Sequence, residues 1–195
     1  MGRKKYIVAI TGASGSVLAL RFIGELLKTS EVHLIISTSA FSVIKDETGN
    51  DWNTAALSTL REYFKSEHLF YSKEGDLYCP LLSGTFLNDG MIVIPCSMKT
   101  LSGIANGYGE NIVQRAADVT LKERRRLILV PREMPFSAIH LENMLKLSRI
   151  GVTIAPPVMA FYTKPKSIDD MLNFITGKLL DNLSISHNLF KRWGN

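Results

Sequence analysis

The chain has 195 residues and a formal charge of +5 at neutral pH, a length that suits one domain able to bury its own core. Hydrophobic residues make up 46% and charged residues 21%, which is ordinary globular usage and excludes a disordered or fibrous chain. Two cysteines are too few for a disulfide framework, so nothing indicates an oxidising compartment. The basic balance suits an anionic small molecule or a nucleic acid, and composition does not choose between them.

The first apolar run, residues 6–11, comes after three basic residues and has the outline of a signal peptide. The run stops at Gly12, and Arg21 interrupts the next apolar stretch, which favours a buried first strand instead. No stretch approaches the roughly 20 apolar residues of a membrane span. We therefore expect a cytoplasmic protein without a membrane partner.

Short runs rich in Val and Ile alternate along the chain with segments of helical periodicity. The runs show little polar alternation, as strands buried on both faces of a parallel sheet should. This predicts an α/β fold, a three-layer Rossmann-like or flavodoxin-like doubly wound parallel sheet forming one domain over residues 1–195. The predicted strands are residues 6–11, 32–37, 91–95, 127–130 and 152–155, and the predicted helices are residues 16–28, 39–46, 97–105, 111–126, 137–150 and 168–183.

Residues 49–90 are the least regular part of the sequence. A helix fits residues 54–65 and a turn fits residues 74–76, and we interpret the whole stretch as an insertion or an excursion at the sheet edge. Ser167 is followed by two acidic residues in the next turn, which predicts that it caps the last helix.

The loops after the strands are the candidate sites, because ligands of open parallel sheets bind beyond the carboxyl ends of the strands. In the first of these loops, Gly12 and Gly15 allow close backbone approach, and Ser14 and Ser16 add hydroxyl groups. The helix after the loop would present free N–H groups to an anion such as the phosphate of a flavin. The loop is neither a dinucleotide-binding GxGxxG motif nor a P-loop, and a tight turn with a serine cap is the alternative.

The loop at residues 95–100 again joins a strand end to a helix start. Ser97 and Thr100 could cap the helix, donate to a ligand, or do both. Cys96 is either a nucleophile or a small buried residue. No histidine lies near it in the sequence, which favours the buried role.

Charged residues gather at two further places. Arg132 and Glu133 lie between two prolines directly after a buried strand, where they form either a site or a surface ion pair. Arg115 and Lys122 are seven residues apart and share one face of a predicted helix. The basic run at residues 122–126 suits a solvated helix end, and no nucleic-acid-binding module accompanies it.

The fourth strand-end loop, residues 156–162, ends in two aromatic residues that belong to the core or stack on a planar ligand. Trp193, near the end of the chain, is either a docking anchor or a cofactor contact. The four histidines are scattered, and no spacing of Cys, His and carboxylates predicts a metal site.

Together these motifs resemble the flavin prenyltransferase family of UbiX and Pad-type proteins. The resemblance covers nearly the whole chain and is weakest over residues 49–90. Each motif alone is weak, but their combination is highly specific. The matching text lies at residues 11–15, 95–101, 115–118, 121–125, 129–133, 140–145, 161–162, 165 and 167–170.

The resemblance implies an FMN-binding subunit of a dodecamer, with active sites at subunit interfaces. It implies a metal-independent prenyltransferase that joins the dimethylallyl group of dimethylallyl monophosphate to N5 and C6 of reduced FMN. The prenylated FMN would serve a UbiD-type decarboxylase. Members of the family were long labelled aromatic-acid or polyprenyl-hydroxybenzoate decarboxylases.

Carried over by motif, the resemblance implies three sets of site residues. Catalytic support would come from Ser14, Glu47, Glu133 and Lys122. The FMN contacts would be Gly12, Ala13, Ser14, Ser37, Ser97, Met98, Lys99, Thr100 and Arg132. The prenyl phosphate would meet Arg115, Lys122, Tyr162, Lys178 and Trp193. Many members have arginine at Lys178, and lysine keeps the charge without the planar two-point fork.

The chemistry suits these residue types. Breaking the C–O bond of an allylic phosphate needs cations around the leaving group, and ring closure at C6 needs a base such as Glu133. One alternative is an FMN-dependent decarboxylase of the cysteine-decarboxylase type, which uses a histidine after the second strand; residues 37–47 contain none. The other is a flavodoxin-like flavin carrier, but such carriers are usually acidic and this chain is +5.

Overall fold

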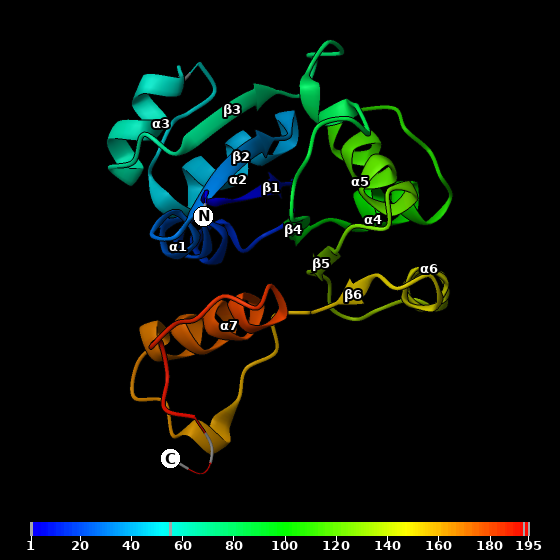
Figure 1. The fold of residues 1–195 in the computed structure, drawn as a ribbon. Helices are drawn as coiled ribbons and strands as arrows, with labels where there is room; N and C mark the ends of the chain where they lie inside the picture. The colour runs from blue at the N-terminus through cyan, green and yellow to red at the C-terminus, as the bar shows by residue number, and fades with distance from the viewer. Residues whose placement is uncertain (1, 55, 193, 195) are drawn as a thin grey trace.

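The structure is a computed structural model that describes residues 2–54, 56–192 and 194. In this described part of the chain, six parallel strands form one sheet in the order β3-β2-β1-β4-β5-β6 (Figure 1). The strands are β1 (Lys4–Ile10), β2 (Ser30–Ile36), β3 (Leu69–Lys73), β4 (Gly90–Cys96), β5 (Leu127–Pro131) and β6 (Thr153–Ile154).

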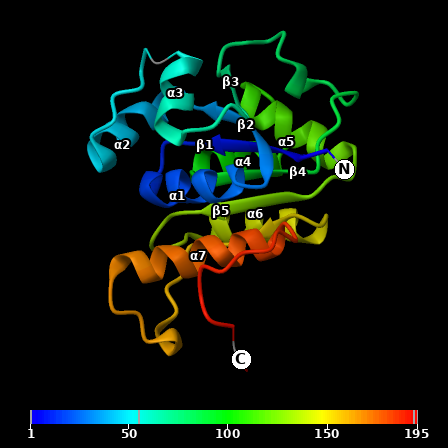
Figure 2. The same cartoon turned by 60° about the vertical axis from the view of Figure 1, so that its left-hand side comes forward.

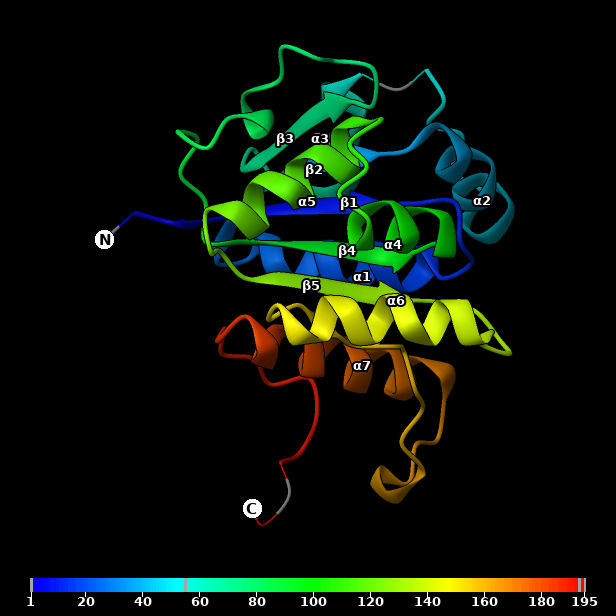
Figure 3. The ribbon, with the colours of Figure 1, turned by 90° about the vertical axis from the view of Figure 1, so that its right-hand side faces the viewer.

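Helices cover both faces of the sheet and give three layers. Figure 3 shows α4, α5 and α6 in front of the strands and α1 and α7 behind them, while Figure 2 shows α2 and α3 beside β2 and β3. The helices are α1 (Ser16–Leu27), α2 (Thr38–Thr48), α3 (Leu57–Phe64), α4 (Met98–Ala105), α5 (Ile112–Lys122), α6 (Ala138–Arg149) and α7 (Ile168–Asn182). Two short 3₁₀ turns, η1 (Pro80–Leu82) and η2 (Phe161–Thr163), lie in the connections.

The central strand shows why the sequence folds in this way. In β1, Val8 and Ile10 pack into the core under α1, while Ile7 and Ala9 pack into the core under α4 and α5. All four side chains are at most 1% exposed. Because both faces are covered from Tyr6 onward, the strand is apolar from Tyr6 to Ile10, and each buried Val or Ile contributes about 1.5–3 kcal/mol.

The predicted doubly wound α/β fold is confirmed, and the structure adds one strand to it. β3 lies inside residues 49–90, the stretch whose pattern indicates an insertion or an edge excursion, and it pairs only with β2. The apolar run of β3 is only three residues long, Leu69–Tyr71, and only Leu69 is fully buried, so the pattern is too short to reveal the strand.

The helix predicted at residues 111–126 ends earlier, at Lys122. Arg124 adopts the left-handed conformation with φ 54°, which breaks the helix. Arg125 donates to the carbonyl oxygens of Gly84 and Phe86 at 2.7 Å each, and these bonds fix the departing chain.

Other local predictions are confirmed. The helix expected near residues 54–65 is α3, and the N–H of Asp76 donates to the carbonyl of Lys73 at 3.0 Å in the expected turn. Ser167 caps α7 by accepting the N–H of Asp170 at 3.1 Å. Across the described ranges, no helix combines the length and the apolar character needed to cross a membrane.

The strand order fixes where a ligand can bind. The chain moves outward in one direction from β1 to β2 and β3, and in the other direction from β4 to β5 and β6. The crevice of such a sheet opens beyond the carboxyl ends of the two strands at the switch point, here β1 and β4. The loops after these strands begin at Thr11 and Ser97.

Candidate active site

Thr11 joins the carboxyl ends of the two central strands. Its hydroxyl donates to the carbonyl of Pro95 at 2.7 Å and accepts the N–H of Ser97 at 2.8 Å. The Thr11 side chain is buried, so these bonds are shielded from water. The loops after β1 and β4 are therefore held against each other at the switch point.

The loops after β2 and β5 extend this row on either side. The N–H of Ser37 donates to the carbonyl of Ile10 at 2.9 Å, and the N–H of Arg132 donates to the carbonyl of Cys96 at 3.2 Å. The structure thus brings together the predicted residues after four neighbouring strands, in the order Ser37, Gly12, Ser97 and Arg132.

Gly12 lies where another chain segment passes closely. A Cβ built on Gly12 would lie 2.4 Å from Oγ of Ser39, closer than real Cβ contacts come. The Ser39 hydroxyl in turn lies 3.2 Å from that of Ser37. Sequence analysis missed Ser39, although its position two residues after Ser37 in a strand-end Ser-Thr-Ser run was the available signal.

The start of α1 already holds an anion from within the chain. The carboxylate of Glu47 accepts the N–H of Gly15 at 3.0 Å and the N–H of Ser16 at 2.6 Å. Gly15 has φ 120°, a conformation that favours glycine and turns its N–H toward this carboxylate. The expectation that these N–H groups are free for a ligand anion is therefore wrong, because Glu47 occupies the helix N-terminus.

The environment of Glu47 keeps it ionised. Partial burial by itself raises the pKa of the Glu47 carboxyl, but hydrogen bonds from the Ser14 hydroxyl and from the N–H groups of Gly15, Ser16 and Val17 outweigh it and hold the pKa below its usual range. Glu47 and Ser14, both predicted as catalytic, thus lie together at the loop before α1, and the Ser14 side chain helps to lower the pKa of the Glu47 carboxyl.

Ser97 caps α4 as predicted. Its hydroxyl accepts the N–H of Thr100 at 3.3 Å and lies 3.1 Å from the Thr100 hydroxyl. Met98 is half-buried and Lys99 exposed in the first turn of this helix. Cys96 is completely buried, and burial raises the pKa of its thiol far above the usual range, so the buried role predicted for it is confirmed.

Arg132 and Glu133 extend beyond β5 into solvent. The Glu133 carboxylate accepts the N–H of Met134 at 3.0 Å. Within the part of the chain that the structure describes, Arg132 and Glu133 form no ion pair with each other. Neither of them forms an ion pair with any other described residue. Both charged groups remain available at the carboxyl edge of the sheet.

Lys122 lies at the opposite edge of the sheet from the predicted residues after the strand ends. Its ammonium pairs with Glu123 at 3.0 Å, beside Gly84. Four residues later, the carbonyl of Arg126 accepts the N–H of Met91 at the start of β4. The seven residues of β4 therefore separate Lys122 from Ser97 by about 20 Å. Arg115 is exposed in the first turn of α5.

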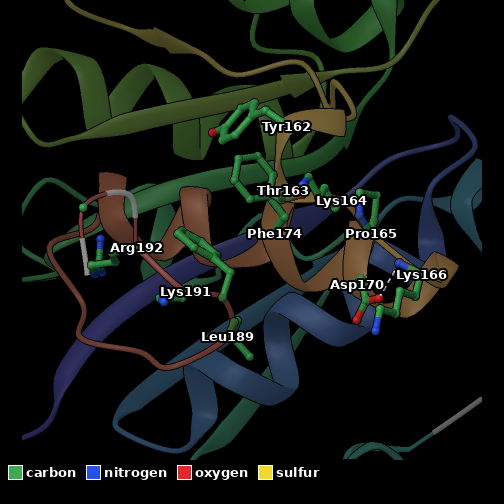
Figure 4. A pocket seen from close by; sticks show the side chains of 12 residues that line it. Tyr162, Thr163, Lys164, Pro165, Lys166, Asp170, Phe174, Leu189, Lys191 and Arg192 are labelled. Carbon is green, nitrogen blue, oxygen red and sulfur yellow. Dashed lines mark hydrogen bonds between the residues drawn. The ribbon is translucent and has the colours of Figure 1, made fainter.

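Tyr162 lines a pocket of about 520 Å³ on the outer side of α7 (Figure 4). Lys178 comes one helical turn after Phe174 on the same face of α7 but does not line the pocket. None of the strand-end residues lines the pocket either. Trp193, predicted to contact the substrate, lies outside the described residues. The pocket lining consists of Tyr162, Thr163, Lys164, Pro165, Lys166, Asp170, Phe174, Leu189, Phe190, Lys191, Arg192 and Gly194.

We call Ser37, Gly12, Ser97 and Arg132, which follow four neighbouring strands, the strand-end row. The residues in and beside this row suit a flavin. The close approach at Gly12 leaves no room for a side chain, and the hydroxyls of Ser37, Ser39, Ser97 and Thr100 supply donors and acceptors around it. The buried hydroxyl of Ser16 has no hydrogen-bond partner among the described residues. In the same residues, no group of three His, Cys, Asp or Glu side chains is placed to hold a metal ion.

The fold and this row of loops define a flavoprotein, and residues 1–180 match the family model described as Flavoprotein. Flavin prenyltransferase UbiX of Methanocaldococcus jannaschii is 51% identical over 190 residues, which cover 97% of this chain and 98% of the relative. The chain therefore belongs to the flavin prenyltransferase family, and its flavin is FMN.

Two crystal structures agree with this assignment. AnUbiX (PadA1) in complex with FMN and dimethylallyl pyrophosphate matches with a TM-score of 0.89 at 42% identity, covering 100% of this chain and 99% of that one. A dodecameric FMN-dependent Ubix-like decarboxylase from Escherichia coli O157:H7 matches with a TM-score of 0.88 at 43% identity, covering 98% and 100%.

Proposed function

We propose that this protein transfers the dimethylallyl group of dimethylallyl monophosphate to N5 and C6 of reduced FMN. The observation that carries the proposal is the row of four hydrogen-bonded strand ends, which gathers Gly12, Ser37, Ser97 and Arg132 at one edge of the sheet. The bound flavin supplies the nucleophilic nitrogen and carbon. In the reaction, the allylic C–O bond breaks with its electron pair on the phosphate, while N5 bonds the released carbon and gives up its proton. The remaining double bond then takes up a proton at one carbon and bonds C6 through the other, and C6 loses its proton.

The proposed roles follow from where each side chain lies. Ser37, Ser97 and Thr100 hydrogen-bond the flavin, and Arg132 balances its negative charge. Glu133 is exposed at the same edge and accepts the proton that leaves C6. Glu47 acts through Ser14, because its carboxylate holds the first loop while remaining ionised.

The prenyl phosphate needs cations that one chain does not bring to the flavin edge. Lys122 lies at the amino edge of the sheet, about 20 Å from Ser97 along β4. We therefore propose that Lys122 serves the flavin edge of a neighbouring copy, and that Arg115, Tyr162, Lys178 and Trp193 complete the phosphate site across the same interface.

The surface supports such an assembly, which we propose to be a dodecamer like the E. coli relative. The outer face of α6 exposes 68% of Ile139 and 50% of Leu145, and Met134 beside Glu133 is 92% exposed. Large apolar side chains this exposed mark an interaction surface, and Met134 places part of it beside Glu133 in the proposed site.

The proposal extends to the recipient of the product and to the location of the protein. The prenylated FMN would pass to a UbiD-type decarboxylase. A cytoplasmic location suits the two cysteines, Cys79 and Cys96, which are buried and unpaired.

The test is direct. Purified protein is mixed anaerobically with reduced FMN and dimethylallyl monophosphate, and the flavin is examined by mass spectrometry and absorbance. Prenylated FMN is the expected product, and dimethylallyl diphosphate in a parallel reaction shows which donor is used faster. Unmodified FMN with either donor, at protein concentrations that preserve the oligomer, contradicts the proposal. Decarboxylation of a cysteine peptide in place of prenylation would favour the alternative enzyme class.

A further inference from the structure

The last described segment of the chain is tied to α7 by three side chains. The carboxylate of Asp181, near the end of α7, accepts hydrogen bonds from Arg192 at 2.7 and 3.2 Å and lies 3.3 Å from Nε2 of His187. Nδ1 of His187 accepts the N–H of Leu189 at 3.2 Å. Only 3% of the His187 side chain is exposed. We call Asp181, His187 and Arg192 the tail clasp.

The C-terminal segment packs closely against α7 at Gly177. A Cβ built on Gly177 would lie 2.5 Å from Cε1 of His187 and 2.5 Å from Cε1 of Phe190. Both atoms belong to rings that rest directly on the helix backbone, so any side chain at position 177 must push them away. The clasp therefore depends on a glycine in a helix interior, where glycine by itself is destabilising.

A series of ring contacts connects the clasp to the pocket beside it. The Arg192 guanidinium lies 5.8 Å from the ring of Phe190, and that ring lies 5.0 Å from Phe174. Phe174 meets Tyr162 edge-on at 5.9 Å. Figure 4 shows Lys191 and Arg192 on the opposite side of the pocket from Thr163 and Pro165. The clasped segment is thus one wall of the pocket.

The lining of this pocket suits an anion that carries a short apolar group. Three aromatic rings, those of Tyr162, Phe174 and Phe190, provide the apolar surface. Lys164, Lys166 and Lys191 provide positive charge, against the carboxylate of Asp170 in the lining, while the charge of Arg192 is already paired with Asp181. That carboxylate already accepts the N–H groups of Lys166 and Ser167 at 2.8 and 3.1 Å, which leaves the cations in excess.

We propose that the tail clasp positions the C-terminal segment as a wall of the prenyl phosphate site and thereby sets the affinity for that substrate. Asp181 and His187 are positioning residues in this view, and Arg192 acts by holding Asp181 rather than by contacting the phosphate. The inference rests on the proposed function, since it assigns the segment to the prenyl phosphate of that reaction.

Two variants loosen the clasp in different ways. Asp181→Asn removes the negative charge to which Arg192 is bonded. Gly177→Ala displaces the rings of His187 and Phe190 without changing any charge. In FMN-loaded protein we expect both to raise the KM for dimethylallyl monophosphate at least tenfold, with the FMN Kd and the kcat at saturation unchanged. Gly24→Ala is the matched control, because Gly24 is also helical and has no atom within 4 Å of a built Cβ.

A second readout does not depend on catalysis. Trypsin cleaves after Lys191 and Arg192, and intact-mass analysis should show cleavage there at least tenfold faster in Asp181→Asn and Gly177→Ala than in the parent or Gly24→Ala. Melting temperatures confirm that each variant is folded. Equal cleavage rates with an unchanged KM overturn the inference, and so does a fall in kcat at unchanged KM.

Arg192→Lys separates holding from direct charge. Lysine keeps the positive charge but cannot make the two-point contact with Asp181, so the KM should rise as in Asp181→Asn. A parent-like KM in Arg192→Lys together with a raised KM in Arg192→Gln would assign Arg192 to the phosphate and overturn the clasp. If the parent protein forms no prenylated FMN, the proposed function itself fails; a clasp variant without effect on a working enzyme overturns only this inference.

Discussion

The carboxylate of Glu47 accepts the backbone N–H of Ser16 at 2.6 Å, across the boundary between α2 and α1. An anion at a helix N-terminus is stabilised by the unpaired N–H groups and by the helix dipole. The contact fixes the loop that carries Gly12 and Ser14 before any ligand arrives. The first loop is therefore shaped by the protein's own carboxylate.

Glu47→Gln should destabilise the protein at pH 7 by about 0.5–2 kcal/mol, as loss of a helix cap does. The folded-state pKa of Glu47 is lowered, so its stabilisation is present above the unfolded pKa of about 4.3 and is lost as the pH falls through the folded value. Urea denaturation should therefore show a larger difference between the parent and Glu47→Gln at pH 7 than at pH 3. The control Glu25→Gln removes a surface pair with Lys28 and should change little. An equal loss at both pH values contradicts the assignment.

FMN should stabilise the protein and NAD should not. FMN at about 100 times its Kd should add roughly 2.7 kcal/mol to the free energy of unfolding. For a chain of this length that corresponds to a rise in Tm of about 5–11 °C. A thermal shift series with FMN and NAD measures it. A Tm raised by NAD and unmoved by FMN is the opposite of what the strand-end row predicts.

Gly12→Ala should damage the flavin site through a steric clash, because the new methyl group meets Ser39 Oγ at 2.4 Å. We expect an overpacking cost of about 1–3 kcal/mol and weaker FMN binding. The double variant Gly12→Ala/Ser39→Gly removes the clashing atoms and should recover stability. Gly75→Ala is the control, since a Cβ there meets no atom within 4 Å. Full FMN affinity in Gly12→Ala alone would show that the close approach does not matter.

Lys122→Ala should weaken binding of the prenyl phosphate while FMN still binds. Loss of a charge-assisted contact costs on the order of 1.5–3 kcal/mol, which is about a 10- to 150-fold rise in KM. Kinetics over a range of dimethylallyl monophosphate concentrations measure the effect, with Lys28→Ala, a surface lysine paired to Glu25, as control. Unchanged kinetics would leave Lys122 as a solvated residue at a helix end.

The position of Lys122 also predicts the outcome of mixing two variants that are each impaired at low concentrations of dimethylallyl monophosphate. If Lys122 serves the flavin edge of another copy, subunits carrying Lys122→Ala and subunits carrying Ser14→Ala should regain part of the activity when reassembled together. Each mixed oligomer then holds some interfaces with both residues intact. Mixtures no more active at that substrate concentration than the average of their components would argue that each site is built from one chain.

Glu133→Gln should slow ring closure at C6 while FMN binding survives. The amide keeps the shape of the side chain but cannot accept the proton, and positioned acid–base groups contribute about 10²–10⁴-fold to rates. A rapid-quench time course should show flavin that has gained the prenyl mass before its absorbance reports the closed ring. If the variant closes the ring at the parent rate, Glu47 becomes the next carboxylate to test.

The central strands were predictable because burial on both faces leaves continuous apolar runs, as in β1 and β4. The edge strand β3 was not, since only Leu69 is fully buried. The strand-end loops were predictable from their Gly and Ser residues. The contacts of Glu47 and Ser39 were not, because they depend on where α2 lies in space. The position of Lys122 at the amino edge of the sheet could have been predicted from the sequence. A helix between two parallel strands runs antiparallel to them, so its last turn lies at the amino edge.

Because both thiols are buried, their reactivity can be used to measure local opening of the structure. Cys79 is 4% exposed and Cys96 is fully covered at the end of β4, so a thiol reagent reacts only when the structure around each sulfur transiently opens. The labelling rate of Cys96 then measures the free energy of opening beside the switch point, and that of Cys79 measures the opening of η1. A ligand seated against the loop after β4 should slow the first rate and leave the second unchanged, which maps local rigidity without any introduced probe.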